Sequence, residues 1–157
     1  MKDLIPLVLF QVEAQRYAVS LSAVQRIVRA VEVTPLLKGP PIVLGIIDVE
    51  GRILPVINFR KRLGLPEREI SPVDQFVIAQ TTRRTLVVVV DKTLGVIERA
   101  PGEIVETASV VPGLPQIQGV IQLADGLVLV HDLETFLSLD ESRTLDEAIN
   151  LEARHEN

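Results

Sequence analysis

The segment GIIDVEGRILPVINFR, residues 45–60, decides how the rest of the chain is interpreted. Two runs rich in Ile, Val and Leu, Ile42–Val49 and Arg52–Asn58, flank the turn-like pair Glu50-Gly51. Short β-branched runs on either side of such a pair are typical of a β-hairpin, because glycine adopts the positive φ of tight turns without steric cost. The asparagine that ends the second run can cap a short helix over Phe59–Leu63. The segment therefore predicts strand, turn, strand and helix in succession.

The same pattern recurs 74 residues later as GVIQLADGLVLVHDLE, residues 119–134, with the leading glycine and the helix cap in matching places. Upstream, Leu7–Leu21 matches Phe76–Val90 at an offset of 69 residues. Periodicity alone rarely aligns glycines and caps together with apolar positions. We therefore interpret the chain as two copies of one unit, Leu7–Leu63 and Phe76–Leu137.

Each copy carries roughly five short strands and a short helix, and a unit of that size buries too little surface to be stable alone. Closing each sheet into a barrel and packing the barrels together removes exposed strand edges. The sequence thus predicts an all-β protein of two five-stranded barrel subdomains with a few short helices. We expect a domain over residues 1–139, with repeats at 7–63 and 76–137, a linker at 64–73 and a helical tail at 140–157.

Two further helices are expected towards the carboxyl end. Asp132 can cap a turn over Leu133–Leu139. Thr144-Leu145-Asp146-Glu147 has the form of a capping box, so the last helix is predicted to begin there. The basic run Arg60-Lys61-Arg62 is interpreted as an exposed face of the short helix that follows the first hairpin.

Composition excludes several classes of function. The 157 residues include no Cys and two His, which rules out thiolate zinc sites, disulfide frameworks and cysteine nucleophiles. A net charge of −5 and an aromatic content of 3% argue against binding to nucleic acid. Neither a membrane-spanning run nor the residue order of a signal peptide is recognisable. We expect a cytoplasmic protein with no direct membrane insertion and with neither a metal nor another cofactor.

Candidate catalytic groups are few. Asp48 and Glu50 form a possible acid–base pair, but they stand in turn-like sequence, where solvated carboxylates are the common case. Asp91 ends a run of four valines and is expected to cap a turn. His131 occupies an alternating strand position and is expected to pack rather than to catalyse. A binding module is therefore favoured over an enzyme, and an enzyme that uses the carboxylate pair stays as the less favoured alternative.

Residues 45–60 resemble the signature G-V-I-N-L-R-G-x-I-x-P-V-x-D-L-R of the CheW family of chemotaxis coupling proteins. The resemblance continues in the correct order from about Leu7 to Leu139. Its further motifs are Leu7–Val12 with Tyr17–Val19, Val24–Ile27 against V-x-E-I, Val88–Asp91 with Val96, and Leu129–Leu133 against L-L-D-L.

The resemblance implies two intertwined SH3-like five-stranded barrels and a non-catalytic adaptor that holds a CheA-type histidine kinase against the cytoplasmic tip of chemoreceptors. It also implies recruitment to receptor arrays at the membrane. The positions that match the family's motifs for contact with the kinase regulatory domain are Val24, Arg26, Val33 and Gly45. Those that match its motifs for contact with the receptor are Glu50 and Phe76.

Two residues depart from the family pattern. Glu50 stands where the family usually has Arg, and Arg26 stands where it often has Glu. Reversing a charge at the rim of an interface costs complementarity with one partner and can select another. We therefore expect either a divergent coupling protein with a non-standard receptor, or neutral change on a tolerant surface. A regulatory domain derived from a larger kinase or from a coupling–receiver protein is the alternative assignment.

Overall fold

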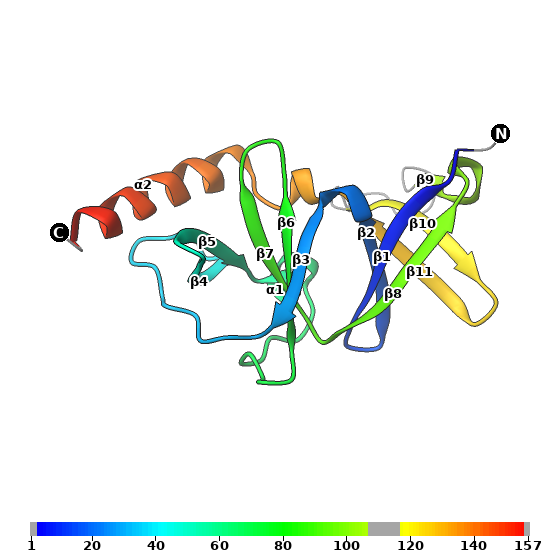
Figure 1. The fold of residues 1–157 in the computed structure, drawn as a ribbon, viewed down its shortest axis with the longest axis horizontal. Helices are drawn as coiled ribbons and strands as arrows, with labels where there is room; N and C mark the ends of the chain where they lie inside the picture. The colour runs from blue at the N-terminus through cyan, green and yellow to red at the C-terminus, as the bar shows by residue number, and fades with distance from the viewer. Residues whose placement is uncertain (1–2, 107–116, 156–157) are drawn as a thin grey trace.

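The structure is a computed structural model that describes residues 3–106 and 117–155. Two β-sheets lie side by side along the long axis of the molecule (Figure 1). Residues 107–116, which belong to the second sequence copy, lie outside the described part.

The first sheet has six strands in the order β8-β1-β2-β11-β10-β9. Apart from β2 and β11, which are parallel, neighbouring strands are antiparallel. The strands are β1 (Ile5–Val12), β2 (Gln15–Ser20), β8 (Lys92–Arg99), β9 (Val105–Glu106), β10 (Ile117–Leu123) and β11 (Gly126–His131).

The second sheet has five strands in the order β3-β6-β7-β5-β4, with β5 and β7 parallel. The strands are β3 (Val24–Arg29), β4 (Val43–Val49), β5 (Arg52–Ile57), β6 (Gln75–Gln80) and β7 (Thr85–Val90). The segment after β3 bridges back to β4, where Thr34 pairs with Ile46. That bridge joins the two edges of the sheet and closes it into a barrel.

The two sheets exchange hairpins between the sequence copies. The β1–β2 hairpin of the first copy lies beside β10–β11 of the second, and β6–β7 lies beside β4–β5. The strand register follows the sequence repeat. Ala18 pairs with Val130 in the six-stranded sheet. The residues at the equivalent positions of the other copy, Val87 and Val56, pair in the five-stranded sheet. Residues 7–63 and 76–137 are therefore copies in sequence, and neither forms a barrel of its own.

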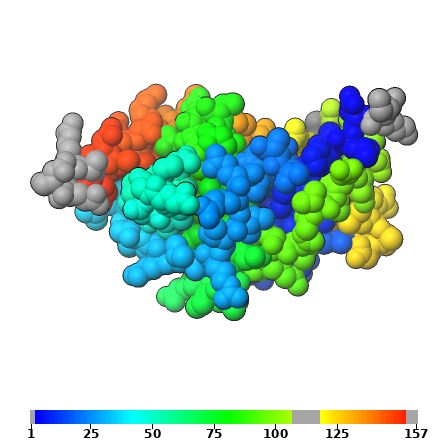
Figure 2. Space-filling model, in the orientation of Figure 1, coloured from blue at the N-terminus to red at the C-terminus, as the bar shows by residue number. Residues whose placement is uncertain are grey.

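The outer strands repeat the exchange. Leu7 pairs with Ile97 between β1 and β8, and the equivalent residues Phe76 and Val28 pair between β6 and β3. Figure 2 shows the result on the surface, where the amino-terminal segment and the yellow segment near residue 125 occupy the same end of the molecule. The pairings named here thus recur at the offsets of the two sequence copies.

The largest core cluster lies between the sheets and includes residues of both, such as Val8, Phe10, Val77 and Val88. Most of the few aromatic side chains gather there around His131, with ring centroids 5.0–5.8 Å apart; they are Phe10, Tyr17, Phe59 and Phe136. His131 is buried among them, in agreement with its predicted packing role. Burial raises the pKa of Tyr17 above its ordinary value, and the nearby Arg60 charge opposes that rise.

Of the predicted helices, α1 (Phe59–Leu63) begins and ends as expected, with Asn58 accepting a hydrogen bond from the Lys61 backbone N–H. The helix expected over 133–139 is a single 3-10 turn, η4 (Leu133–Thr135). The last helix, α2 (Leu139–His155), begins five residues before the predicted start. Ion pairs tie it to Arg62 of α1 and to Arg84 just before β7, and Leu145 and Ala148 on it are buried, so it is a part of the fold rather than a free tail (Figure 1).

Candidate functional site

The residues expected to contact partners lie together on or beside the five-stranded sheet. Val24 and Arg26 are on β3, Gly45 is on β4, and Glu50 is at the β4–β5 turn. Val33 lies in the segment between β3 and β4. Phe76 is on β6. Sequence positions 24 to 76 thus converge on one barrel, although their side chains have different surroundings.

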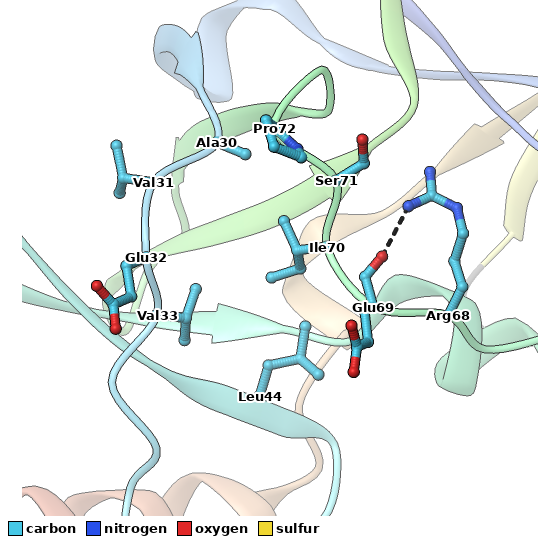
Figure 3. Close-up of a pocket in the computed structure, with 10 residues that line it drawn as sticks. All are labelled: Ala30, Val31, Glu32, Val33, Leu44, Arg68, Glu69, Ile70, Ser71 and Pro72. Carbon is cyan, nitrogen blue, oxygen red and sulfur yellow. Dashed lines mark hydrogen bonds between the residues drawn. The ribbon is translucent and has the colours of Figure 1, made fainter.

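An open apolar groove of about 470 Å³ lies on this barrel between the segment after β3 and the segment before β6 (Figure 3). Val33, Leu44 and Ile70 point towards one another along its floor. Val31 and Leu44 are 53% and 37% exposed, so apolar surface is left in contact with solvent. The remaining lining residues are Ala30, Glu32, Arg68, Glu69, Ser71 and Pro72.

Gly45 determines the shape of this groove from beneath. It is buried, and a Cβ atom built on it would come within 2.3 Å of the Thr34 carbonyl oxygen and 2.6 Å of Val33 Cγ1. The close approach permits two backbone hydrogen bonds between Thr34 and Ile46, of 2.8 and 2.9 Å. Gly45 therefore positions Val33 at the groove and does not itself present a contact surface.

Besides Gly45, two more of the expected contact residues pack against core clusters. Phe76 is fully buried in a cluster with Ile47 and Leu54, because its side chain lies on the inward face of β6. A partner at the surface cannot touch Phe76 directly, which corrects its expected role. Val24 is half-buried and packs against the largest core cluster, so a charge introduced there would disturb the fold.

Arg26 and Glu50 form an ion pair between β3 and the β4–β5 turn. Arg26 Nη1 lies 3.0 Å from Glu50 Oε1, and the two side chains are 49% and 79% exposed. Glu50 adopts a positive φ of 52° in the turn, which brings its side chain towards β3. The two residues that depart from the family pattern are therefore direct neighbours.

The carboxylate pair proposed for catalysis does not converge. Asp48 Oδ1 accepts a hydrogen bond of 2.8 Å from the Gly51 backbone N–H and so caps the turn. Glu50 is held by Arg26 instead. Paired acid–base catalysis requires two carboxylates that face one reacting group. Within residues 3–106 and 117–155, moreover, no group of three or more carboxylates and imidazoles is arranged to hold a metal ion.

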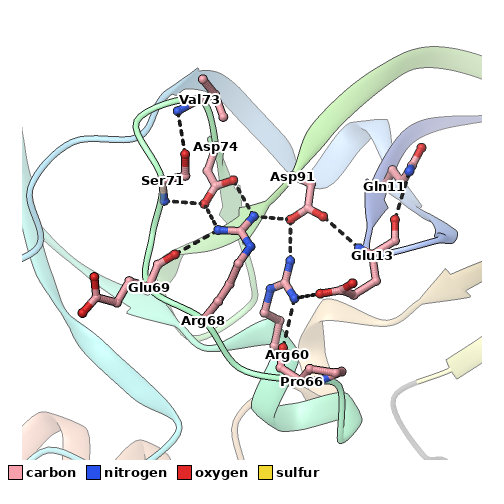
Figure 4. Close-up of polar contacts among 10 residues, drawn as sticks. All are labelled: Gln11, Glu13, Arg60, Pro66, Arg68, Glu69, Ser71, Val73, Asp74 and Asp91. Atoms are coloured by element: carbon pink, nitrogen blue, oxygen red, sulfur yellow. Dashed lines mark hydrogen bonds and ion pairs between the residues drawn. The ribbon is translucent and has the colours of Figure 1, made fainter.

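A network of ion pairs links the two sheets, and one of its members, Arg68, also lines the groove (Figure 4). Arg60 pairs with Glu13 of the β1–β2 turn and, at 2.8 Å, with Asp91 after β7. Arg68 of the linker pairs with Asp91 and Asp74, each at 2.8 Å. Asp91 Oδ2 also accepts a hydrogen bond from the Glu13 backbone N–H, so its predicted turn-capping role extends across the sheets.

The charges of this network are stabilised by one another. Burial alone would raise the pKa of Asp74, but hydrogen bonds from Arg68 and the Ser71 backbone outweigh burial and lower it. Hydrogen bonding to Asp74 raises the pKa of Arg68. Burial lowers the pKa of Arg60, and its hydrogen bonds to Glu13 and Asp91 more than compensate. The guanidinium groups are therefore fixed as structural cations.

The basic run 60–62 was expected to be exposed, and that expectation is wrong for its two arginines. Arg60 is only 8% exposed, because α1 turns it into the network. Arg62 is half-buried and pairs with Glu141 of α2 at 2.6 Å. Lys61 alone faces solvent. Ile70 and Arg68 were not predicted to line a site. In the sequence, Ile70 is an isolated apolar residue and Arg68 an ordinary arginine in a polar linker.

With this geometry established, the chain can be compared with known proteins. A sequence model described as the CheW-like domain matches residues 6–144, which is most of the chain. The chain belongs to the CheW-like domain family. The match confirms the family that the motifs at 45–60 and along the rest of the chain indicate.

Curated relatives extend the CheW assignment over nearly the whole length. The chain is 28% identical to the chemotaxis protein CheW of Treponema pallidum over 145 residues, covering 88% of this chain and 85% of the relative. It is 25% identical to that of Rhizobium meliloti over 137 residues, covering 86% and 88%. The role predicted from the sequence, a CheW-type adaptor in chemotaxis signalling, is confirmed at the level of the family.

The fold agrees with a solved structure of the same family. The crystal structure of the scaffolding protein TtCheW from Thermoanaerobacter tengcongensis superposes with a TM-score of 0.80 at 22% identity. The superposition covers 90% of this chain and 96% of that one. This likeness confirms the predicted mostly-β fold of two barrels. None of the helices in the described part of the chain is long and apolar enough to cross a bilayer.

Proposed function

We propose that this CheW-like chain is a non-catalytic adaptor whose five-stranded barrel binds both the regulatory domain of a CheA-type kinase and the cytoplasmic tip of a chemoreceptor. The observation that carries the proposal is the open apolar groove between Val31, Leu44 and Ile70. The adaptor acts in the cytoplasm and is recruited to receptor arrays at the membrane through these contacts.

The groove supports the kinase assignment because it has the anatomy of a protein interface. Apolar side chains form its centre, and charged residues such as Glu32 and Glu69 stand at its rim. Exposed apolar surface that is rimmed by polar groups commonly marks a docking site. Val33 lines the groove, and Gly45 holds the segment that carries it. Two of the positions matched to kinase contact thus support one surface.

The receptor assignment rests on the β4–β5 turn. The Glu50 side chain is 79% exposed, and it stands on the turn between β4 and β5. Phe76 supports this region from the interior and has no surface role. The receptor face and the kinase face meet at the ion pair between Arg26 and Glu50.

A pair of matched substitutions tests the kinase surface. Val31→Glu places a charge at the groove, and Val96→Glu places the same charge at an equally exposed position on the other sheet, since both residues are 53% exposed. We expect Val31→Glu to weaken binding to the regulatory domain of a CheA-type kinase from the same organism by about tenfold or more, because a charge is buried at an apolar contact. Val96→Glu should change it by less than about twofold.

Isothermal titration calorimetry measures both affinities, and thermal unfolding shows that each variant folds. Kinase binding that withstands Val31→Glu, or that is lost equally in both variants, contradicts the proposed surface. Absence of any binding by the wild-type chain contradicts the proposed function as a whole.

A further inference from the structure

The apolar groove carries a negative charge on each of its two walls. Glu32 stands on the segment after β3 and Glu69 on the linker before β6, and both side chains are exposed. Figure 3 shows neither carboxylate joined to another of the lining residues. Throughout residues 3–106 and 117–155, moreover, no side chain or backbone group pairs with either carboxylate. Both charges are therefore available to a partner.

Arg68 also lines the groove, but its charge does not offset those of the walls. Its guanidinium pairs with Asp74 and Asp91, each at 2.8 Å, and donates to the Glu69 backbone carbonyl at 2.9 Å (Figure 4). Arg29 of β3 is next to the lining residues in sequence and is not one of them. The groove thus presents an apolar floor between two unpaired carboxylates.

The floor and the walls favour different parts of a partner. Val33, Leu44 and Ile70 can bury apolar side chains, and a volume of about 470 Å³ has room for a few of them. Charges at the rim of an interface attract opposite charges on the partner, steer its approach and fix its register. A segment with Asp or Glu beside its apolar residues would instead meet like charges on both walls.

We infer that the groove selects a segment of the kinase regulatory domain in which apolar side chains are flanked by lysine or arginine, and that Glu32 and Glu69 pair with those basic groups. The inference deepens the proposed function and rests on it, because it takes the groove as the kinase contact. Apolar burial supplies most of the affinity of such a contact, and the two carboxylates determine which partner is accepted.

Reversing the charge of both walls tests this inference. The groove variant, Glu32→Lys with Glu69→Lys, is compared with wild type and with a control variant, Glu98→Lys with Glu147→Lys. Glu98 lies on β8 and Glu147 on α2; both are exposed outside the groove, so the control changes the net charge equally. Surface plasmon resonance at low and at physiological salt measures binding to the kinase regulatory domain from the same organism, and thermal unfolding shows that each variant folds.

The groove variant should bind the kinase domain about tenfold more weakly at low salt, chiefly through slower association, whereas the control should stay within about twofold of wild type. The difference should shrink as salt is added, because salt screens exposed charges. Lysines and arginines of the kinase domain are then replaced by Glu one at a time. At least one replacement should weaken binding of the wild type and strengthen binding of the groove variant.

The outcomes separate the inference from the proposed function. Equal affinity of the groove variant and wild type, tighter binding by the groove variant, or an equal loss in the control overturns the selection of a basic segment. The proposed function is then judged by Val31→Glu, which acts on the apolar surface of the groove. A wild-type chain that does not bind the kinase domain overturns the proposed function and the inference with it.

Discussion

Gly45 and Gly119 occupy equivalent places in the two copies and solve the same steric problem. A Cβ atom on Gly119 would lie 2.4 Å from Ile104 Cγ2 and 3.1 Å from the Val105 carbonyl oxygen, much as one on Gly45 would collide with Thr34. In both barrels the segment that follows an outer strand must approach its neighbour closely to close the sheet. The alignment of these glycines in the sequence therefore reflects a shared packing requirement.

The buried carboxylate of Asp74 makes the fold sensitive to acid. Its side chain is 2% exposed and its pKa is lowered by Arg68 and the Ser71 backbone. A carboxyl whose pKa is lower in the folded state stabilises the protein above its unfolded pKa, near 3.8, and that stability is lost as the pH falls through the folded value. Asp74→Asn should lower the free energy of unfolding at pH 7 by about 2–4 kcal/mol.

Urea denaturation at several pH values measures this effect. The difference between wild type and Asp74→Asn should shrink as the pH is lowered below about 4, because the wild-type carboxyl then also becomes neutral. Glu98→Gln, at an exposed position on β8, serves as the control and should follow the wild type. A difference that stays constant with pH would show that the charge of Asp74 is not what stabilises the fold.

At the scale of elements, α2 begins where its cap is best satisfied. Ser138 Oγ accepts from the Glu141 backbone N–H at 3.0 Å, and Glu141 Oε1 accepts from the Ser138 N–H at 2.8 Å. This is a complete capping box, and Arg62 binds the same Glu141 oxygen. Burial would raise the pKa of Glu141, but Arg62 and Ser138 outweigh burial and lower it.

Ser138→Ala should therefore destabilise the protein by about 1 kcal/mol, as the loss of an N-cap commonly does. Thr144→Ala is the matched control, because Thr144 is exposed in the interior of α2 and alanine is at least as favourable there. Urea denaturation of both variants distinguishes the two possible caps. A larger cost for Thr144→Ala would place the start of the helix at the later capping box.

The sequence predicted the elements that local signals specify. The hairpins around Gly51 and Gly126 and the cap at Asn58 are where turn chemistry places them. The predicted start of the last helix is too late, because the sequence offers two similar capping boxes, SLDE at 138–141 and TLDE at 144–147. Only the tertiary contact between Arg62 and Glu141 distinguishes the first box from the second. Local propensity cannot supply that information.

Local signals do not mark every strand. β3, β8 and β9 are largely exposed outer strands without a regular apolar alternation, and β3 carries a register shift between Val24 and Arg26. Their positions depend on backbone pairing with distant strands. The groove was missed with them, because it is formed where the segment after β3 meets the linker.

At the scale of the whole molecule, the exchanged hairpins make the two barrels one cooperative unit. Cleavage of the chain after Gly64 gives fragments 1–64 and 65–157, and each lacks strands that both sheets require. We expect neither fragment alone to give the dispersed amide spectrum of a folded protein, whereas an equimolar mixture should recover it. Arg68 and Asp74 remain on one fragment, so their ion pair is not the link under test.

Nuclear magnetic resonance spectra of the separate and mixed fragments provide the measurement. Fragment 1–64 folding alone would show that the first sequence copy can form its own barrel, as the repeat boundaries first suggested. Recovery only on mixing would show that pairing between copies, through β2–β11 and β5–β7, supplies the stability.

The exchange of hairpins also bears on ancestry. A half-length polypeptide with a single copy of the unit would complete its sheets only by associating with an identical partner about a two-fold axis. Joining the two genes end to end would have relieved both halves of the need to stay alike. The first half was then free to acquire the ion pair between Arg26 and Glu50, and the second to acquire the helix α2 at its carboxyl end.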